Sequence, residues 1–215
     1  MCGRYGLISK PQALIKRFDV ENNEFDFKEN YNVAPSLKMP IIERHSPNSV
    51  HLREWGALLY NKYFTINART DKLETNNIWK KAIQERRCII PADYFFEWKR
   101  TEKSKQPYLF RLKNKELMGF AGFLVDYLDK DKKERTGYIM LTTEANSIME
   151  PIHDRIPVIL RKEDEDQWLN PDTVEFEHLL KFLKPFPSEE MDAFPVSQVV
   201  NSPRNNDKSI INPQI

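Results

Sequence analysis

CIIPADYFFEWKR, residues Cys88 to Arg100, decides how this 215-residue chain folds. The stretch is apolar and aromatic, and Pro91-Ala92-Asp93 interrupts it. Apolar runs of this length next to turn-forming residues are typical of short buried strands. We therefore predict two short strands around a bend, with Glu97 as a charged residue inside the second strand.

Strand-like runs also flank this stretch on both sides. We expect them at residues 3–8, 39–44, 49–55, 107–113, 117–125, 135–143, 157–160 and 194–200. Short helices are expected at residues 75–87, 143–149, 163–169 and 174–183, and another opens at Ser9 and Pro11. Strands and helices do not alternate regularly, so the pattern favours an α+β fold with a mainly antiparallel, curved sheet. The length suits one domain, residues 1–201, followed by a loose polar tail at residues 202–215.

Composition excludes several classes of protein. Charged residues make up 30% of the chain and hydrophobic residues 40%, which is typical of a soluble globular protein. No apolar run approaches the ~20 residues that span a bilayer, and the N-terminus lacks a signal peptide. Only two cysteines are present, so we expect a reducing cytoplasmic setting. Without metal-ligand spacing, a phosphate loop or a dinucleotide motif, we predict no metal and no cofactor.

The net charge of +1 hides an asymmetry along the chain. Residues 161–193 hold ten acidic and four basic side chains, so the remaining segments carry an excess of seven positive charges. This excess allows a basic face for an anionic partner, although an ordinary solvated surface fits the composition equally well.

MCGRY, residues Met1 to Tyr5, places a cysteine directly after the initiator methionine. Removal of Met1 would leave Cys2 with an α-amine and a thiol on adjacent carbons. The amine, with a pKa near ~7.7–8.0, is substantially neutral at cellular pH. It can condense with an aldehyde, and the thiol can then close a five-membered thiazolidine. By itself, however, a cysteine at this position also fits a frayed terminus without function.

Four further residues could carry chemistry. If Glu97 points inward among its aromatic neighbours, desolvation would raise its pKa and make it a general acid, whereas strand alternation could equally expose it. His153 lies in PIHDRIP and could shuttle protons or serve only the loop. Asn67 and Arg69 share one face of an extended INARTD segment, where an amide and a guanidinium suit an anion or a polarised carbonyl.

Eight blocks in order resemble the SOS response-associated peptidase (SRAP) family, whose members process abasic sites in DNA. They are MCGRY, YNVAPS, NARTD, RRCIIPADYFFEWK, KQPYLF, FAGF, TTEANSIMEPIHDRIPVIL and PVSQVVN, from residue 1 to about residue 201. The resemblance implies a pseudo-barrel of mainly antiparallel strands with flanking short helices. It also implies a basic groove for single-stranded DNA and removal of Met1, in which the protein itself could act as the peptidase.

The resemblance also assigns roles to individual residues. Cys2 would form a thiazolidine crosslink with the ring-opened sugar of an abasic site, and Asn67 would orient the Cys2 terminus. Glu97 matches the family's catalytic glutamate and His153 its catalytic histidine. The resemblance also implies a possible AP-lyase side activity of the protein. The positions that contact DNA phosphates or bases are Arg4, Arg69, Trp98 and Arg155.

The chain departs from the family pattern in three blocks. NARTD replaces NARSE, YFFEW replaces GFYEW, and Trp55-Gly-Ala-Leu-Leu59 stands for WGLIP. The second change affects the backbone near the bend, and the third affects the DNA-binding face.

Two other functions are alternatives. Class II glutamine amidotransferases also begin Met-Cys-Gly, but Arg4 stands where a hydrophobic residue is typical of them. A non-catalytic module that binds single-stranded DNA is the other. The favoured hypothesis is the SRAP-like function. It predicts a cytoplasmic, nucleoid-associated monomer whose partner is single-stranded DNA with abasic sites.

Overall fold

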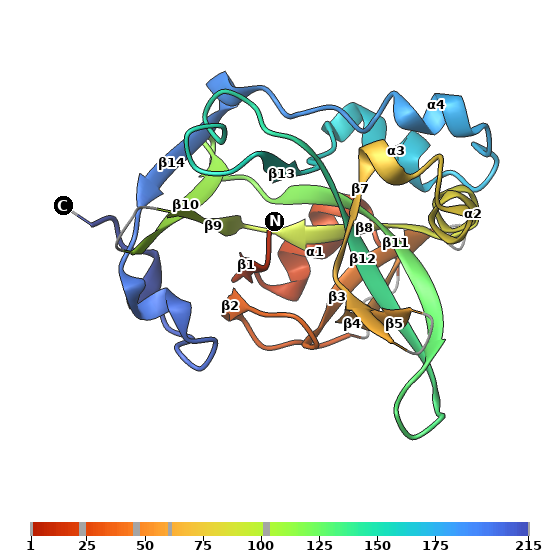
Figure 1. The fold of residues 1–215 in the computed structure, drawn as a ribbon, viewed down its shortest axis with the longest axis horizontal. Coiled ribbons are helices and arrows are strands. Elements are labelled where there is room, and N and C mark those ends of the chain that lie inside the picture. Colours follow the sequence, from red (N-terminus) through yellow and green to blue (C-terminus); the bar gives the residue numbers. More distant parts are fainter. Residues whose placement is uncertain (1, 22–24, 45–47, 60–61, 101–103, 215) are drawn as a thin grey trace.

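The computed structural model describes residues 2–21, 25–44, 48–59, 62–100 and 104–214, and Met1 lies outside them. Strands dominate these residues, and the helices between them are short (Figure 1). None of the helices in the described part is long and apolar enough to cross a membrane. The predicted α+β fold with mainly antiparallel strands is confirmed.

One sheet closes on itself to form a barrel of five strands. The strand order is β11-β8-β3-β4-β12, and β12 pairs with β11 to close the ring. Only the contact between β12 and β4 in this ring is parallel. Two short strands, β7 and β13, also pair with β12. The bounds are β3 (Lys38–Arg44), β4 (Asn48–Trp55), β7 (Asn67–Arg69), β8 (Arg87–Ala92), β11 (Met118–Leu128), β12 (Glu134–Glu144) and β13 (Arg155–Pro157).

A second sheet of five strands contains the start of the chain. Its order is β14-β10-β9-β1-β2, with every pair antiparallel. Its strands are β1 (Arg4–Leu7), β2 (Asn30–Val33), β9 (Tyr94–Arg100), β10 (Lys105–Leu112) and β14 (Met191–Pro195). A separate hairpin joins β5 (Ala57–Leu59) to β6 (Tyr63–Thr65). Because β1 lies between β9 and β2, the first residues of the chain reach the interior instead of an outer edge.

The stretch from Cys88 to Arg100 links the two sheets, as its interrupted pattern predicts. Strand β8 belongs to the barrel and β9 to the second sheet, and the bend lies at Asp93. The Asp93 carboxylate accepts hydrogen bonds from the Ile8 and Ser9 amides, at 2.6 and 2.9 Å, and from the Ser9 hydroxyl at 2.6 Å. The bend therefore also fixes the end of β1.

Tyr94, where the family pattern has glycine, packs across Gly6 of β1. A Cβ atom at Gly6 would lie 2.1 Å from a Tyr94 ring carbon, so position 6 has no room for a side chain. The departure from GFYEW is thus accommodated by the neighbouring strand. Two large clusters of buried side chains fill the space around β1 and the barrel, and in one of them the hydroxyls of Tyr5 and Tyr138 are 2.8 Å apart.

Short helices lie on the outside of the sheets (Figure 1). They are α1 (Pro11–Phe18), α2 (Asn77–Glu85), α3 (Lys162–Leu169) and α4 (Phe176–Leu180), with 3₁₀ turns η1 (Thr70–Lys72), η2 (Ser188–Glu190), η3 (Gln198–Asn201) and η4 (Lys208–Ile211). The helix predicted at residues 143–149 does not form, because β12 continues to Glu144 and a turn follows. In that turn the Asn146 side chain accepts from the Met149 amide and competes with helical hydrogen bonds.

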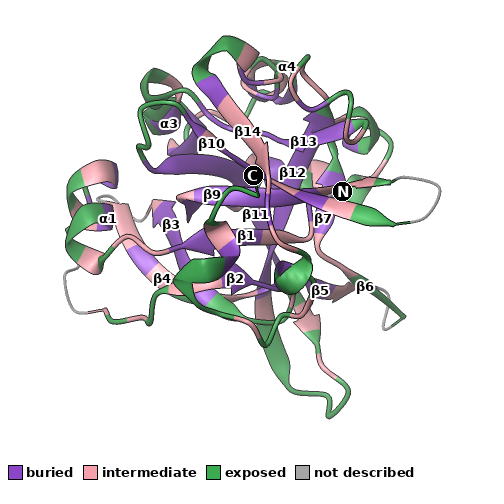
Figure 2. Ribbon diagram, turned by 90° about the vertical axis from the view of Figure 1, so that its left-hand side faces the viewer, coloured by how far each residue is buried: buried purple, intermediate pink, exposed green. Residues whose placement is uncertain are grey.

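The described part of the tail, for which the sequence predicts a loose segment, packs against the second sheet. Ile210 is fully buried in a cluster with Tyr94, Phe96 and Val196. The Gln214 amide donates to the Pro195 carbonyl at 2.8 Å. Figure 2 shows how the buried residues concentrate in the strands and the exposed ones in connections and hairpin tips.

Candidate active site at the start of the chain

Cys2 is buried immediately before β1, with 1% of its surface exposed. Arg4 pairs with Phe96 of β9, and the same register continued toward the chain start would set Gly3 opposite Glu97 and Cys2 opposite Trp98. The thiol lies 3.5 Å from the Arg4 carbonyl oxygen, to which it donates. The Cys2 thiol, just before β1, therefore lies near the carboxylate of Glu97 in the neighbouring strand β9.

Glu97 points into the protein, since only 5% of its surface is exposed. Burial raises the pKa of the Cys2 thiol well above its ordinary value, and the negative charge of Glu97 raises it further. The thiol is therefore protonated at neutral pH. In a site of this kind an amine, once free, is the better first nucleophile, and the thiol can act as S–H in a second step.

Asn67 fixes the main chain of Cys2 from the other sheet. Strand β7 runs parallel to β12, with Asn67 opposite Met140. The Asn67 amide nitrogen donates to the Cys2 carbonyl oxygen at 2.7 Å. Its Oδ1 is buried, and no described residue donates a hydrogen bond to it. The structure thus brings Cys2, Asn67 and Glu97 together directly, although they come from three distant parts of the sequence.

His153 lies in the loop before β13, which pairs with the same end of β12 as β7 does. Its Nδ1 is 3.0 Å from the Arg155 amide nitrogen and 2.8 Å from an Asp154 carboxylate oxygen. A neutral Nδ1 accepts from the amide, whereas a protonated Nδ1 donates to Asp154, so the two contacts correspond to different protonation states. Both contacts orient the ring through its own loop.

Arg69 and Arg155 meet at Asp71, beside a cavity of about 550 Å³. Asp71 accepts two hydrogen bonds from exposed Arg69, which lower the pKa of the carboxyl to about 2. Arg155 is buried, and its guanidinium donates to the Thr142 carbonyl oxygen and approaches Asp71 at 3.4 Å. Burial, followed by the charge of Arg69, lowers the pKa of Arg155. Arg69 is thus the more accessible of the two guanidiniums.

Arg4 of β1 and Trp98 of β9 lie together in the second sheet. The Arg4 guanidinium is 6.0 Å from the centre of the Trp98 ring. Both side chains bind the C-terminal segment, because Arg4 donates to the Asn201 carbonyl oxygen at 3.2 Å and the Trp98 ring nitrogen donates to the Asn201 side chain at 2.7 Å. The sequence did not predict this involvement of Asn201, nor that of buried Asn32, which accepts from Arg4 at 2.7 Å. Asn32 lies inside the YNVAPS block, and its position there is the only sequence signal for it.

Among the described residues, no group of three or more His, Cys, Asp or Glu side chains is arranged to hold a metal ion. The groups that the structure brings together at this site are the Cys2 thiol, the Glu97 carboxylate and the Asn67 amide, and removal of Met1 would add the Cys2 amine.

Comparisons with known proteins agree on one family. The model of the SOS response associated peptidase (SRAP) family matches residues 1–203. The abasic site processing protein YoqW of Bacillus subtilis is 38% identical over 98% of this chain and 99% of its own. The abasic site processing protein YedK of Escherichia coli is 28% identical over 85% of this chain and 84% of its own. A crystal structure of a protein from Bacteroides thetaiotaomicron superimposes with a TM-score of 0.87 at 27% identity, covering both chains completely.

Proposed function

The chain belongs to the SRAP family, and we propose that it processes abasic sites in DNA through Cys2. The substrate is the ring-opened aldehyde of an abasic deoxyribose in single-stranded DNA. The product is a thiazolidine crosslink that shields the strand at the damaged site. The reaction requires removal of Met1, because the amine of Cys2 must be free to attack.

Two bond-forming steps build the product. The Cys2 amine attacks C1′ of the aldehyde and releases water, which gives a Schiff base. The Cys2 S–H then adds across the C=N bond, with sulfur bonding to carbon and the proton passing to nitrogen. A raised thiol pKa suits this order, because the neutral S–H does not compete with the amine for the aldehyde.

The three neighbouring side chains have separate roles in this proposal. Glu97 donates a proton to the ring oxygen of the closed sugar and so promotes opening. Asn67 holds the Cys2 carbonyl with its amide nitrogen, and its buried Oδ1 is available to accept from the Cys2 amine. His153 assists proton transfer near the 3′ phosphate. If the Schiff base eliminates that phosphate before the ring closes, AP-lyase activity results.

The remaining features of the proposal concern DNA and the cell. Arg4, Arg69 and Arg155 contact phosphates and Trp98 contacts a base, so binding depends on backbone shape and not on sequence. The protein acts as a monomer in the cytoplasm, on the nucleoid, after Met1 is removed either by its own peptidase activity or by an aminopeptidase.

The observation that carries the proposal is the hydrogen bond from Asn67 to the Cys2 carbonyl, with the Glu97 charge beside the thiol. An otherwise mobile chain start is held next to a buried carboxylate, as a reactive terminus requires. The test uses Met1-free protein and a labelled single-stranded oligonucleotide with one abasic site. We expect a boiling-resistant, slowly migrating band on a denaturing gel.

Two controls and two alternative outcomes interpret that experiment. Cys2→Ala and undamaged DNA should both give no band. Strand cleavage without a crosslink would reduce the function to that of a lyase. If neither product forms from a verified Cys2 terminus, the proposal is wrong, and ammonia release from glutamine becomes the next measurement.

A further inference from the structure

Asn32 of β2 is a buried amide that joins the chain start to the C-terminal segment. Only 1% of its surface is exposed. Its Nδ2 lies within hydrogen-bonding distance of the carbonyl oxygens of Val200, Ser202 and Asn205, at 3.1, 3.0 and 2.9 Å. The two N–H groups of this amide are thus shared among three carbonyl acceptors, and residues 200–205 are held around the one Asn32 side chain.

The other end of the same amide holds Arg4. The Oδ1 of Asn32 accepts from Arg4 Nη1 at 2.7 Å. Arg4 also donates from Nη1 to the Val200 carbonyl at 3.0 Å and from Nη2 to the Asn201 carbonyl at 3.2 Å. These bonds use three of the five N–H groups of a guanidinium. No described residue accepts from the other two.

This arrangement fixes the plane of the guanidinium. A free arginine side chain samples many rotamers and loses that freedom when it binds a phosphate. The Arg4 side chain has already lost this rotamer freedom, because Asn32 and two main-chain carbonyls accept hydrogen bonds from three of its guanidinium N–H groups. Asn201 extends the same contact to Trp98, whose ring nitrogen donates to its side chain at 2.7 Å.

We propose that Asn32 is a positioning residue for DNA binding: it clamps Arg4 against the C-terminal segment so that the two remaining N–H groups form a preorganised site for one backbone phosphate beside Trp98. The inference rests on the proposed function and deepens it. Asn32 itself touches no DNA, and its effect passes through Arg4.

The experiment measures reversible binding separately from crosslinking. The probe is a single-stranded oligonucleotide with a tetrahydrofuran abasic analogue, which has no aldehyde. Asn32→Ala should weaken binding by about tenfold, the typical worth of a positioned charge-assisted contact. The slope of log K against log salt should fall by about 0.7, as expected for one lost phosphate contact to a single strand. With abasic DNA as substrate, the defect should appear as a raised KM for crosslinking.

A double-mutant cycle identifies the route of the effect. In an Arg4→Ala background, Asn32→Ala should cause no further loss, because the residue through which it acts is gone. Asn206→Ala is the matched control: the Asn206 side chain accepts from the Tyr31 amide at 2.6 Å and holds the same segment without touching Arg4. It should bind DNA like the wild type.

Two results would overturn the inference. One is an equal loss for Asn32→Ala with and without Arg4, and the other is an unchanged salt slope. If Asn32→Ala does not fold, Arg4→Lys serves instead, because it keeps the positive charge but lacks the planar guanidinium. If Arg4→Lys bound DNA with wild-type affinity, preorganisation of the guanidinium would be ruled out. A wild-type protein that forms no crosslink contradicts the proposed function. If the wild type forms the crosslink but Asn32→Ala binds DNA as tightly as the wild type, only this inference is contradicted.

Discussion

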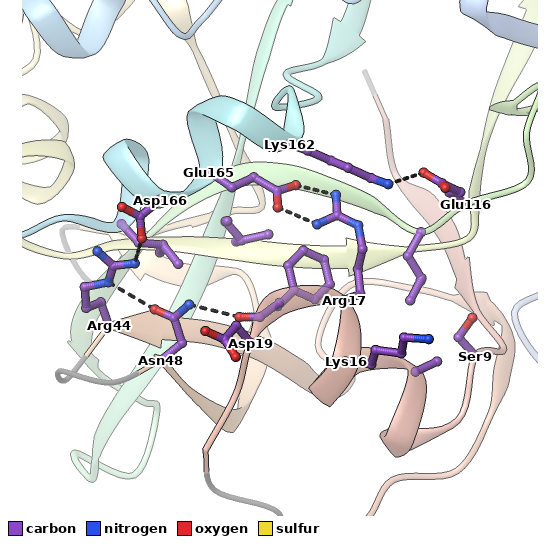
Figure 3. Close-up of a pocket in the computed structure, with 15 residues that line it drawn as sticks. Ser9, Lys16, Arg17, Asp19, Arg44, Asn48, Glu116, Lys162, Glu165 and Asp166 are labelled. Atoms are coloured by element: carbon purple, nitrogen blue, oxygen red, sulfur yellow. Dashed lines mark hydrogen bonds and ion pairs between the residues drawn. The ribbon is translucent and has the colours of Figure 1, made fainter.

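Two buried polar clusters in this protein contain a carboxylate of similar burial but different surroundings. One is the Cys2 site, and the other lines the cleft between α1 and α3, a cavity of about 850 Å³ (Figure 3). In the cleft, Glu165 accepts two hydrogen bonds from Arg17 at 2.6 and 2.7 Å. At the Cys2 site, Glu97 is buried beside a thiol whose pKa its charge helps to raise.

The difference suggests a structural role for the cleft cluster and a chemical role for the Cys2 site. Around Arg17 and Glu165, further opposite charges pair across the cleft, with Lys162 on Glu116 and Arg44 on Asp166 (Figure 3). Such a cluster joins two helices and leaves its charged groups engaged with each other. The Cys2 site instead places a buried thiol beside a buried carboxylate. The cleft between α1 and α3 is therefore not the site that we propose for the chemistry.

The strongest test of the comparison removes the carboxylate at the Cys2 site. Glu97→Gln keeps the shape of the side chain but cannot transfer a proton, so crosslinking should slow by about a hundredfold to ten-thousandfold. Loss of the charge should also lower the pKa of the Cys2 thiol, because Glu97 contributes to raising it. The rate of crosslinking and the pH dependence of thiol alkylation in the N-terminal peptide measure the two effects.

Glu43→Gln is the matched control for a buried carboxylate. Glu43 of β3 is 6% exposed and pairs with Arg53 at 3.0 Å. This variant should crosslink at the wild-type rate. If Glu97→Gln also reacts at the wild-type rate, the carboxylate beside Cys2 is not the general acid, and the contrast between the clusters fails.

The second test breaks the structural cluster. Arg17→Met leaves Glu165 buried without its bidentate partner, so the free energy of unfolding should fall by about 3–5 kcal/mol. Crosslinking by the folded variant should be unaffected. Denaturant unfolding measures the loss, with Lys16→Met, an exposed neighbour on the same helix, as a control that should be nearly neutral.

The deficit of Arg17→Met should depend on pH in a defined direction. Burial raises the pKa of Glu165, and the hydrogen bonds and charge of Arg17 oppose that rise. Without Arg17 the folded-state pKa rises further above the unfolded value, so protonation favours the folded variant. The deficit should therefore shrink as the pH falls from 8 toward 5. A deficit that grows on acidification would mean that Glu165 is not the strained group.

Much of the fold could be predicted from the sequence, because strands and helices leave local patterns. The apolar stretch around Asp93 and the helix predicted at residues 75–87 both correspond to observed elements. Local patterns do not predict closure of the barrel, since the pairing of β11 with β12 and of β12 with β4 depends on contacts between distant segments, and only the family resemblance implied the pseudo-barrel that the structure confirms. The packing of the tail was missed because Ile210 is a single apolar anchor in a polar segment.

The candidate site was predictable only in part. Cys2 stands out because its position creates an aminothiol, whereas Glu97, Asn67 and His153 acquired roles through the resemblance of their blocks to a family. Their own local patterns left structural explanations open. Asn32 and Asn201 could not be identified, because an amide that binds main-chain carbonyls leaves no periodic signal.

The smallest expected effect concerns the bend that joins the two regions of the fold. Asp93→Asn keeps one oxygen acceptor but loses the charge and one of the oxygens that bind Ile8 and Ser9. Unfolding should become easier by about 1–2 kcal/mol, the usual worth of a charge-assisted hydrogen bond. Crosslinking should change little, because β9 and β2 still hold β1 on both sides. Ser9→Ala removes only the hydroxyl contact and should cost less. If Asp93→Asn instead abolished crosslinking while the protein stayed folded, the bend would belong to the reactive site, and the division between structural and reactive carboxylates would have to be redrawn.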